Sequence, residues 1–325
     1  MKLVINIPCY NEEKTLPSVL REIPKRIEGI DVIEVQIVDD GSTDKTSEVA
    51  AEHGCVVIRH KRNKGLGVAF SKGVKEALKR GADVFVNTDA DNQYPSRYIP
   101  RLVKPVLDHE ADIVIGNRKP WKVKHFSPIK RFLQFLGNGI TRRISGTKVP
   151  DMVSGFRAYS REALLMLNVT TKFSYVLDTV VQASKKGLKI RSVYVKVNPP
   201  TRRSRLFKNI FQHMRKSAAN ILRVYSIYEP FRTFLFLSFL FFVPGFILLS
   251  RFFFFYFTEP GPTGYIQSLI VSTVFLVFSG LMFSLGIIGE LISVNRILIE
   301  DDLYLKKKQS FGKNQANPKK STKSR

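Results

Sequence analysis

Two carboxylates one residue apart, Asp89 and Asp91, are the residues in this chain best placed to do chemistry. They follow the mostly apolar stretch 83–87, which is bounded by turn residues and therefore predicts a buried strand. In open α/β sheets, ligands bind at the carboxyl ends of the strands. With the amide of Gln93 nearby, the pair suits a hard divalent ion such as Mg²⁺ or Mn²⁺, and such an ion commonly holds nucleotide phosphates. The motif is weak alone, so its surroundings decide its meaning.

Strand and helix patterns alternate over the first 120 or so residues. Strands are expected at 3–7, 32–38, 56–58, 84–87 and 112–115, and helices at 13–26, 44–53, 66–80 and 96–109. This alternation predicts an α/β fold, with a mostly parallel sheet that carries helices on both faces.

Further polar loops follow the first two strands, at 8–12 and 39–44, and a third loop at 63–67 opens the third helix. Each loop has a structural alternative, since Asn11 and Ser42 are residues that commonly cap helices. Three such loops after successive strands of one sheet favour a nucleotide-binding edge over capping alone.

The pattern changes after residue 120. Basic amphipathic segments are expected at about 122–145 and at 201–229, and they enclose a strand-like element from Asp151, a helix at 173–185 and a strand at 190–197. A basic amphipathic helix that leads into a membrane span is expected to lie on an anionic leaflet.

Charge and apolar runs indicate the partners. Lys and Arg total 52 against 27 Asp and Glu, a net charge of +25, which implies nucleic acid, anionic lipid or a phosphorylated substrate. The two cysteines have no zinc-site spacing and are expected to be buried, reduced thiols.

Two uncharged runs predict a transmembrane hairpin at about 231–257 and 265–292, within a membrane region at 230–300. Basic residues flank the hairpin, whereas the turn between its helices has none. This asymmetry predicts that the catalytic domain and both termini lie in the cytoplasm. Residues 305–325 are expected to form a basic disordered tail.

The motifs resemble those of family 2 glycosyltransferases of the GT-A fold, and most of all the polyprenyl-phosphate (dolichyl-phosphate) mannose and glucose synthases. The resemblance covers roughly residues 1–230 and is carried by IPCYNE at 7–12, VDDGSTD at 38–44, NKGLG at 63–67, DADNQ at 89–93 and VSGFR at 153–157. It implies a GT-A catalytic domain at 1–200, interfacial helices and a two-helix hairpin.

The resemblance also implies site residues. The donor nucleotide would be held by Pro8, Tyr10, Asn11, Glu12, Asp39, Asp40, Asp89 and Ala90, and the metal ion and diphosphate by Asp89, Asp91 and Gln93. Asp89, Asp91 and Asp151 are the expected catalytic residues. In some relatives an acidic residue occupies the place of Gly155, so a base role does not carry over, and Asp151 is left to orient the loop, bind sugar hydroxyls or act as a base.

The expected reaction is inverting transfer of a hexose from a GDP-mannose or UDP-glucose type donor to polyprenyl phosphate. A lipid phosphate is largely ionised at neutral pH, so it needs positioning rather than deprotonation. Cations must then hold it, and arginine forks bind phosphate well. The candidates are Arg118, Arg131, Arg202 and Arg203.

Three alternatives stay open. A processive polysaccharide synthase would carry a Q-x-x-R-W motif, which the single tryptophan, Trp121, does not supply. Transfer to a lipid hydroxyl would need a base such as Asp151 or Asp178. A non-catalytic basic membrane protein explains the charge but not the acidic loops, and those loops oppose nucleic acid. The hexose, the nucleotide and the oligomeric state are not decided by the sequence.

Overall fold

A computed structural model provides the fold of the 325-residue chain. It describes residues 1–118, 139, 146, 147, 149–169, 171, 175–199, 219, 223, 226–258 and 265–312. The chain divides into two compact units. The first comprises Met1–Ala218 with Glu300–Arg325, and the second comprises Ala219–Ile299.

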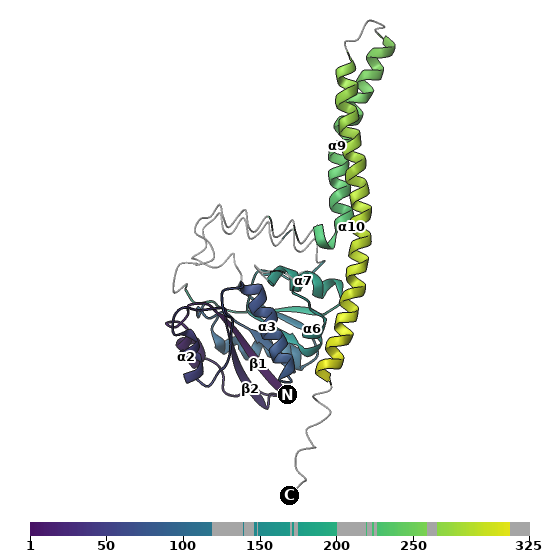
Figure 1. Cartoon of the computed structure of the whole chain (residues 1–325). Coiled ribbons are helices and arrows are strands. Elements are labelled where there is room, and N and C mark those ends of the chain that lie inside the picture. The colour runs from purple at the N-terminus through teal and green to yellow at the C-terminus, as the bar shows by residue number, and fades with distance from the viewer. Residues whose placement is uncertain are drawn as a thin grey trace. The chain divides into compact units, whose positions relative to one another are not determined.

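The first unit is built on a seven-stranded sheet in the order β3-β2-β1-β4-β6-β5-β7 (Figure 1). Its strands are β1 Lys2–Cys9, β2 Val32–Asp39, β3 Val56–Arg59, β4 Val84–Asn87, β5 Ile113–Asn117, β6 Arg157–Ser160 and β7 Ile190–Tyr194. Neighbouring strands run parallel except at β6, which pairs antiparallel with both β4 and β5. The carboxyl ends of β1, β2 and β4 therefore share one edge, as the sequence predicted.

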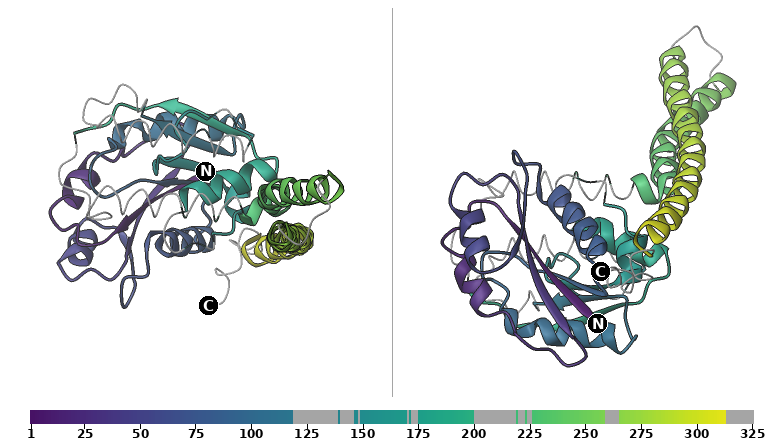
Figure 2. Two further views of the ribbon diagram at one scale, coloured as in Figure 1. Left: turned by 90° about the horizontal axis from the view of Figure 1, so that it is seen from above. Right: turned by 60° about the horizontal axis from the view of Figure 1, so that its bottom comes forward.

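Helices cover both faces of the sheet, and α3 and α4 lie on opposite faces (Figure 2). The helices of this unit are α1 Leu16–Arg21, α2 Thr46–Glu52, α3 Leu66–Lys79, the 3-10 helix η1 Ser96–Tyr98, α4 Ile99–Leu107, α6 Arg161–Met166 and α7 Val176–Lys185. One apolar cluster joins the sheet to α1 and α4, and a second joins it to α3, α6 and α7.

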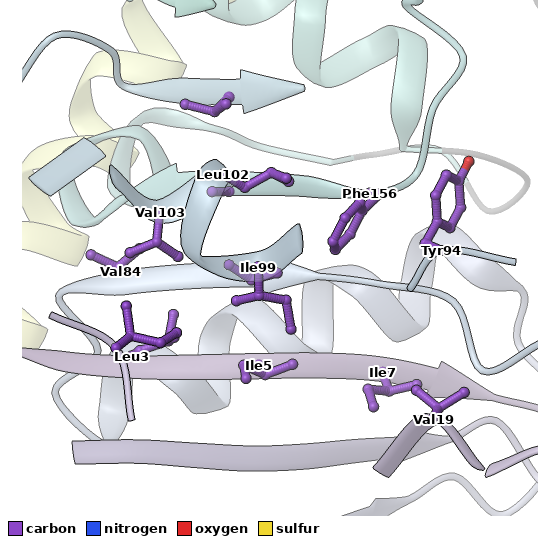
Figure 3. Packing of buried hydrophobic residues seen from close by; sticks show 14 of the residues in the cluster. Leu3, Ile5, Ile7, Val19, Val84, Tyr94, Ile99, Leu102, Val103 and Phe156 are labelled. Atoms are coloured by element: carbon purple, nitrogen blue, oxygen red, sulfur yellow. The ribbon is translucent and has the colours of Figure 1, made fainter. Parts of the chain in front are cut away.

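The central strand β1 contributes to both clusters because successive side chains of a strand point to opposite faces. Leu3, Ile5 and Ile7 belong to the cluster of α1 and α4, and Figure 3 shows Ile5 facing Ile99 and Ile7 beside Val19, while Val4 belongs to the other cluster. All four β1 side chains are fully buried. A central parallel strand that is covered on both faces needs apolar side chains on both, which explains the near-continuous apolar run in β1.

Two expectations for this unit need correction. The strand-like element expected from Asp151 is a loop, and the strand itself, β6, begins at Arg157. The first helix, expected over 13–26, spans only Leu16–Arg21. Pro24 lies close after its end, and a proline disfavours helical geometry in the residue before it.

The second unit contains the predicted helical hairpin. Helices α9 (Pro230–Thr258) and α10 (Ile266–Gly312) run side by side (Figures 1 and 2). They are joined by reciprocal bonds, from Ser238 Oγ to the Ser279 carbonyl at 2.9 Å and from Ser279 Oγ to the Ser238 carbonyl at 3.0 Å. Both helices are long and apolar enough to cross a membrane, and their apolar windows are only 11% and 17% buried. A soluble core helix would bury far more of this surface.

Helix α10 continues well past the expected end of the second span. It reaches Gly312, so residues 305–312 are helical and are not part of a disordered tail. From Glu300 onward the helix belongs to the first unit, where Glu300 pairs with Lys186 at 2.8 Å and the Tyr304 hydroxyl donates to Glu162 at 2.5 Å. Residues 313–325, most of the segment 122–145 and most of the helix expected at 201–229 lie outside the described residues.

Candidate active site

The loops that follow β1 and β2 are joined by short hydrogen bonds. The backbone N–H of Asn11 donates to Ser42 Oγ at 2.9 Å, and Asn11 Oδ1 accepts from the backbone N–H of Thr43 at 2.8 Å. The N–H of Glu12 donates to Thr46 Oγ1 at 2.8 Å. Asn11 has a φ of 57°, a left-handed conformation that asparagine tolerates. Asn11 and Ser42 therefore connect two loops, and neither is the N-cap of α1 or α2.

Asp39, at the end of β2, is fully buried. Its Oδ1 accepts from the Ser42 N–H at 2.7 Å, its Oδ2 accepts from Ser47 Oγ, and Arg59 Nε lies 3.6 Å from Oδ2. Arg59 is half-exposed at the end of β3. The carboxylate thus anchors its own loop and places an arginine beside the site edge.

Asp40 organises the next loop. Its Oδ1 accepts from His60 Nδ1 at 2.7 Å and from the Lys64 N–H at 2.9 Å, and its Oδ2 accepts from the Gly65 N–H at 2.8 Å. Gly65 has a φ of 97°, which favours glycine, and it is the N-cap residue of α3. Asp40 therefore shapes the loop 60–65, and direct contact with a nucleotide stays a prediction for it and for Asp39.

The loop after β1 also presents an aromatic surface. Tyr10 is 41% exposed, in contrast with the buried strand that precedes it, and Pro8 is partly buried. Glu12 is buried, and its Oε2 accepts from Thr15 Oγ1 at 2.6 Å. An exposed aromatic ring at the carboxyl end of a central strand can stack on a flat ligand such as a nucleobase.

The acidic motif lies on a tight loop after β4. Asn92 adopts a φ of 55°, the Gln93 N–H donates to Asp91 Oδ1 at 3.0 Å, and Ala90 is buried. Asn198, which follows β7, donates from its backbone N–H to the Gln93 carbonyl at 3.0 Å and from its side chain to the Asn92 carbonyl at 2.9 Å. The loop is thus held from a distant part of the chain.

Asp89 is the most perturbed acid of the site. The residue is partly exposed, but its carboxylate is largely removed from water. This desolvation is the main cause, and the negative charge of Asp91 the second cause, of a pKa raised to about 7. Glu12 adds to this effect and Arg118 opposes it. Asp89 and Asp91 lie on the same loop as Gln93, and carboxylate and amide oxygens are ligands that a divalent cation prefers. Within the described ranges, no group of three or more His, Cys, Asp or Glu side chains forms a metal site by itself.

Two residues predicted separately, Arg118 and Asp151, form one ion pair. Arg118 donates from Nε to Asp151 Oδ2 at 2.7 Å and from NH2 to Oδ1 at 2.8 Å, and its backbone N–H donates to Oδ2 at 3.1 Å. The aspartate is fully buried, and the arginine side chain is 10% exposed. Both carboxylate oxygens are therefore engaged by the arginine.

Sequence reasoning missed the residues that hold the 151–157 loop. The side chain of Arg157 is fully buried and donates to the carbonyls of Met152 (2.7 Å), Ser154 (2.7 Å) and Val176 (2.8 Å), and to Thr179 Oγ1 (2.9 Å). It thereby ties the loop to the start of α7. The only sequence signal was the presence of an arginine in the VSGFR motif.

Tyr175 was also missed. Its hydroxyl donates to the Gly155 carbonyl at 3.1 Å and accepts from Asn87 Nδ2 at 2.7 Å. A Cβ at Gly155 would lie 3.3 Å from both this hydroxyl and Asp89 Oδ2, so the glycine permits the close approach. The remaining predicted phosphate ligands, Arg131, Arg202 and Arg203, lie outside the described residues.

Comparisons with known proteins agree with this geometry. The model of "Glycosyl transferase family 2" matches residues 4–165, the region that carries the loops after β1, β2 and β4. The chain is 30% identical over 213 residues to the UDP-N-acetylglucosamine–dolichyl-phosphate N-acetylglucosaminyltransferase of Methanococcus voltae, covering 58% of this chain and 83% of that protein. The chain belongs to glycosyl transferase family 2. Within this family it is also 30% identical over 204 residues to the undecaprenyl-phosphate mannosyltransferase of Micrococcus luteus, covering 59% and 82% of the two chains.

A solved structure supports the fold of this family. Glucosyl-3-phosphoglycerate synthase from Mycobacterium tuberculosis, in complex with Mn²⁺, UDP-glucose and phosphoglyceric acid, superposes with a TM-score of 0.55 at 22% identity. The match covers 68% of this chain and 79% of that one. The first unit of this glycosyltransferase therefore has the GT-A fold.

Proposed function

We propose that this glycosyltransferase moves a hexose, with inversion, from a nucleotide sugar to a polyprenyl phosphate at a membrane surface. The observation that carries the proposal is the engagement of Asp151 by Arg118 beside the acidic loops. The site combines a place for a charged donor with a buried cation, and it has no acid at the place of Gly155 to act as a base.

The donor side is the edge formed by the loops after β1, β2 and β4. Tyr10 offers a stacking surface for the base, and Asp39 and Asp40 shape the loops around it. Asp89, Asp91 and Gln93 would hold Mg²⁺ or Mn²⁺, with oxygens of the donor diphosphate completing the ligand set. Once bound, the ion supplies positive charge that stabilises the departing nucleoside diphosphate.

The acceptor side is inferred from the state of Asp151. A lipid hydroxyl would need a general base, whereas a phosphate monoester with a second pKa near 6 is already a nucleophile at neutral pH. Because Asp151 accepts three hydrogen bonds from Arg118, its oxygens serve to orient a cation. Arg118 then offers its remaining N–H groups to the phosphate, with Arg131, Arg202 and Arg203 as further proposed ligands.

The relatives support an acceptor class more than a particular sugar. One is named for N-acetylglucosamine and the other for mannose, but both names contain a prenyl phosphate. The proposal therefore does not specify the transferred sugar, and the test below compares several donors.

The proposal places the enzyme on the cytoplasmic leaflet. The segments before and after the hairpin, Met1–Ala218 and Glu300–Arg325, belong to one compact unit, which supports placing both on the same side of a bilayer. Lysines crowd the end of α10, at 306–308, and the positive-inside rule assigns such a side to the cytoplasm.

A screen of radiolabelled nucleotide sugars against a short polyprenyl phosphate tests the proposal. The matched acceptor is the free polyprenol of the same length, which differs only in lacking the phosphate. We expect metal-dependent transfer to the phosphate and none to the alcohol. Transfer to the alcohol alone would refute the acceptor assignment, and no transfer from any donor would refute the proposed reaction.

A further inference from the structure

The Tyr175 hydroxyl lies where three parts of the site meet. It accepts from Asn87 Nδ2 at 2.7 Å, at the end of β4, and donates to the Gly155 carbonyl at 3.1 Å, in the 151–157 loop. The tyrosine itself precedes α7. Its ring is fully buried and stacks on Phe70 of α3, with 3.9 Å between the ring centroids and 1° between the planes. Packing therefore fixes the ring, and two hydrogen bonds fix its hydroxyl.

Asn87 is itself held from behind by a row of buried amides. Asn6 Nδ2 donates to Asn87 Oδ1 at 2.7 Å, and Gln36 Nε2 donates to Asn6 Oδ1 at 2.7 Å. Gln36 also donates to the Gly73 carbonyl in α3 at 2.8 Å. This row crosses β4, β1 and β2, so the amide that reaches Tyr175 is anchored to the middle of the sheet.

The hydroxyl also touches the space shared by Gly155 and Asp89. A Cβ built on Gly155 would lie 3.3 Å from the Tyr175 hydroxyl and 3.3 and 3.4 Å from the two Asp89 oxygens. The donor-side carboxylate therefore lies against the same loop that, four residues earlier, carries Asp151, whose partner Arg118 follows β5.

We propose that Tyr175 is a positioning residue that sets the separation between the donor-side acid Asp89 and the acceptor-side pair Arg118–Asp151. Its hydroxyl fastens the Gly155 carbonyl to the end of β4, and so it fixes the loop that carries Asp151 relative to the loop that carries Asp89. This inference rests on the proposed function for the meaning of the two sides. Its structural part, the fastening of the loop, can be tested without any turnover.

The variant Tyr175→Phe removes the hydroxyl and keeps the ring on Phe70. Tyr159→Phe is the matched control, because Tyr159 is also fully buried and packs on Phe70 with 5.7 Å between the centroids. Although the Tyr159 hydroxyl lies near Arg157 and Thr179, it makes no hydrogen bond of ordinary length within the described part of the chain. Both variants are made in the full chain, in detergent or lipid nanodiscs.

Hydrogen–deuterium exchange of the peptide spanning 152–157 is the first readout. We expect the amides of this peptide to exchange faster in Tyr175→Phe and to be unchanged in Tyr159→Phe. Only the first variant removes the 3.1 Å bond to the Gly155 carbonyl and leaves that carbonyl with the longer 3.4 Å contact from Asn87 Nδ2. Equal exchange in the two variants would overturn the inference whether or not the protein transfers a sugar.

Single-turnover transfer and donor affinity form the second readout. A small misplacement of reacting groups slows chemistry without weakening the binding of a substrate held elsewhere, so Tyr175→Phe should slow transfer by about ten- to a hundredfold and change donor affinity by less than about twofold. A transfer rate equal to that of Tyr159→Phe would contradict a positioning role, and so would a parallel loss of donor affinity and melting temperature. Absence of transfer in the wild type would instead count against the proposed function, and the exchange result would still decide the role of Tyr175.

Discussion

The substitution Asp151→Asn separates an orienting role for this aspartate from a role as a general base. It keeps the size of the side chain and removes its charge. Asp151 is fully buried, and its three bonds to Arg118 range from 2.7 to 3.1 Å. The substitution leaves a guanidinium that is 10% exposed without its counter-ion.

The expected loss of stability follows from this burial. Removing one partner of a buried ion pair costs about 3–5 kcal/mol, and asparagine belongs at the lower end because it keeps one acceptor. In a domain of this size, roughly 3 kcal/mol lowers the melting temperature by about 6–12 °C. Circular-dichroism melting of the full chain measures it. The double variant Arg118→Met/Asp151→Leu should lose less than the sum of the single variants, since it leaves no uncompensated charge.

Activity gives the decisive comparison. If Asp151 only orients Arg118, then Asp151→Asn and Arg118→Lys should lower transfer similarly, and the pH–rate profile should keep its shape. The reasoning would be refuted by an Asp151→Asn variant that melts with the wild type but has lost the acidic limb of its pH–rate profile. That outcome would make Asp151 a base and would revive the hydroxyl acceptor.

Three further predictions concern the metal, the topology and the end of α10. Asp91→Ala should abolish transfer and Mn²⁺-dependent donor binding but leave the melting curve unchanged, and full activity in excess chelator would contradict a metal site. In inverted vesicles, a cysteine at Thr263 should stay unlabelled by a membrane-impermeant reagent until the vesicles are opened; labelling from the cytoplasmic face would reverse the topology. Burial, followed by the charge of Lys186, lowers the pKa of Lys307 to about 8 from 10.5. The unfolded chain then binds this proton more tightly, so stability should rise with pH between about 8 and 10.5. Lys307→Met should remove this slope in denaturant titrations, whereas the exposed Lys306→Met should keep it, and equal slopes would show that Lys307 is not docked.

The sheet and the acidic loops were largely predictable because they depend on local patterns. Alternating strand and helix signals place the parallel strands, and the polar residues after each strand share an edge because parallel strands end together. Asp89 and Asp91 could be singled out by this logic from their position alone. The roles of Arg131, Arg202 and Arg203 stay predictions because they lie outside the described residues.

The antiparallel strand and the extent of the last helix were less predictable. β6 is only four residues long and pairs with strands far from it in sequence, so nothing near Arg157 marks where the loop ends. Helix α10 extends to Gly312 through a charged stretch that resembles a tail. There, partners more than a hundred residues away, such as Glu162 for Tyr304, hold it in place.

The sequence by itself determined the class of the fold, the two long apolar helices and the acidic edge, because each is written in the order and spacing of neighbouring residues. Only the tertiary structure decided what the side chains at that edge do. Arg118 and Asp151 are 33 residues apart, and Tyr175 is 88 residues from Asn87. These pairs are brought together by the sheet register and the packing of α7, and a buried charge or hydroxyl takes its role from the partner that packing supplies.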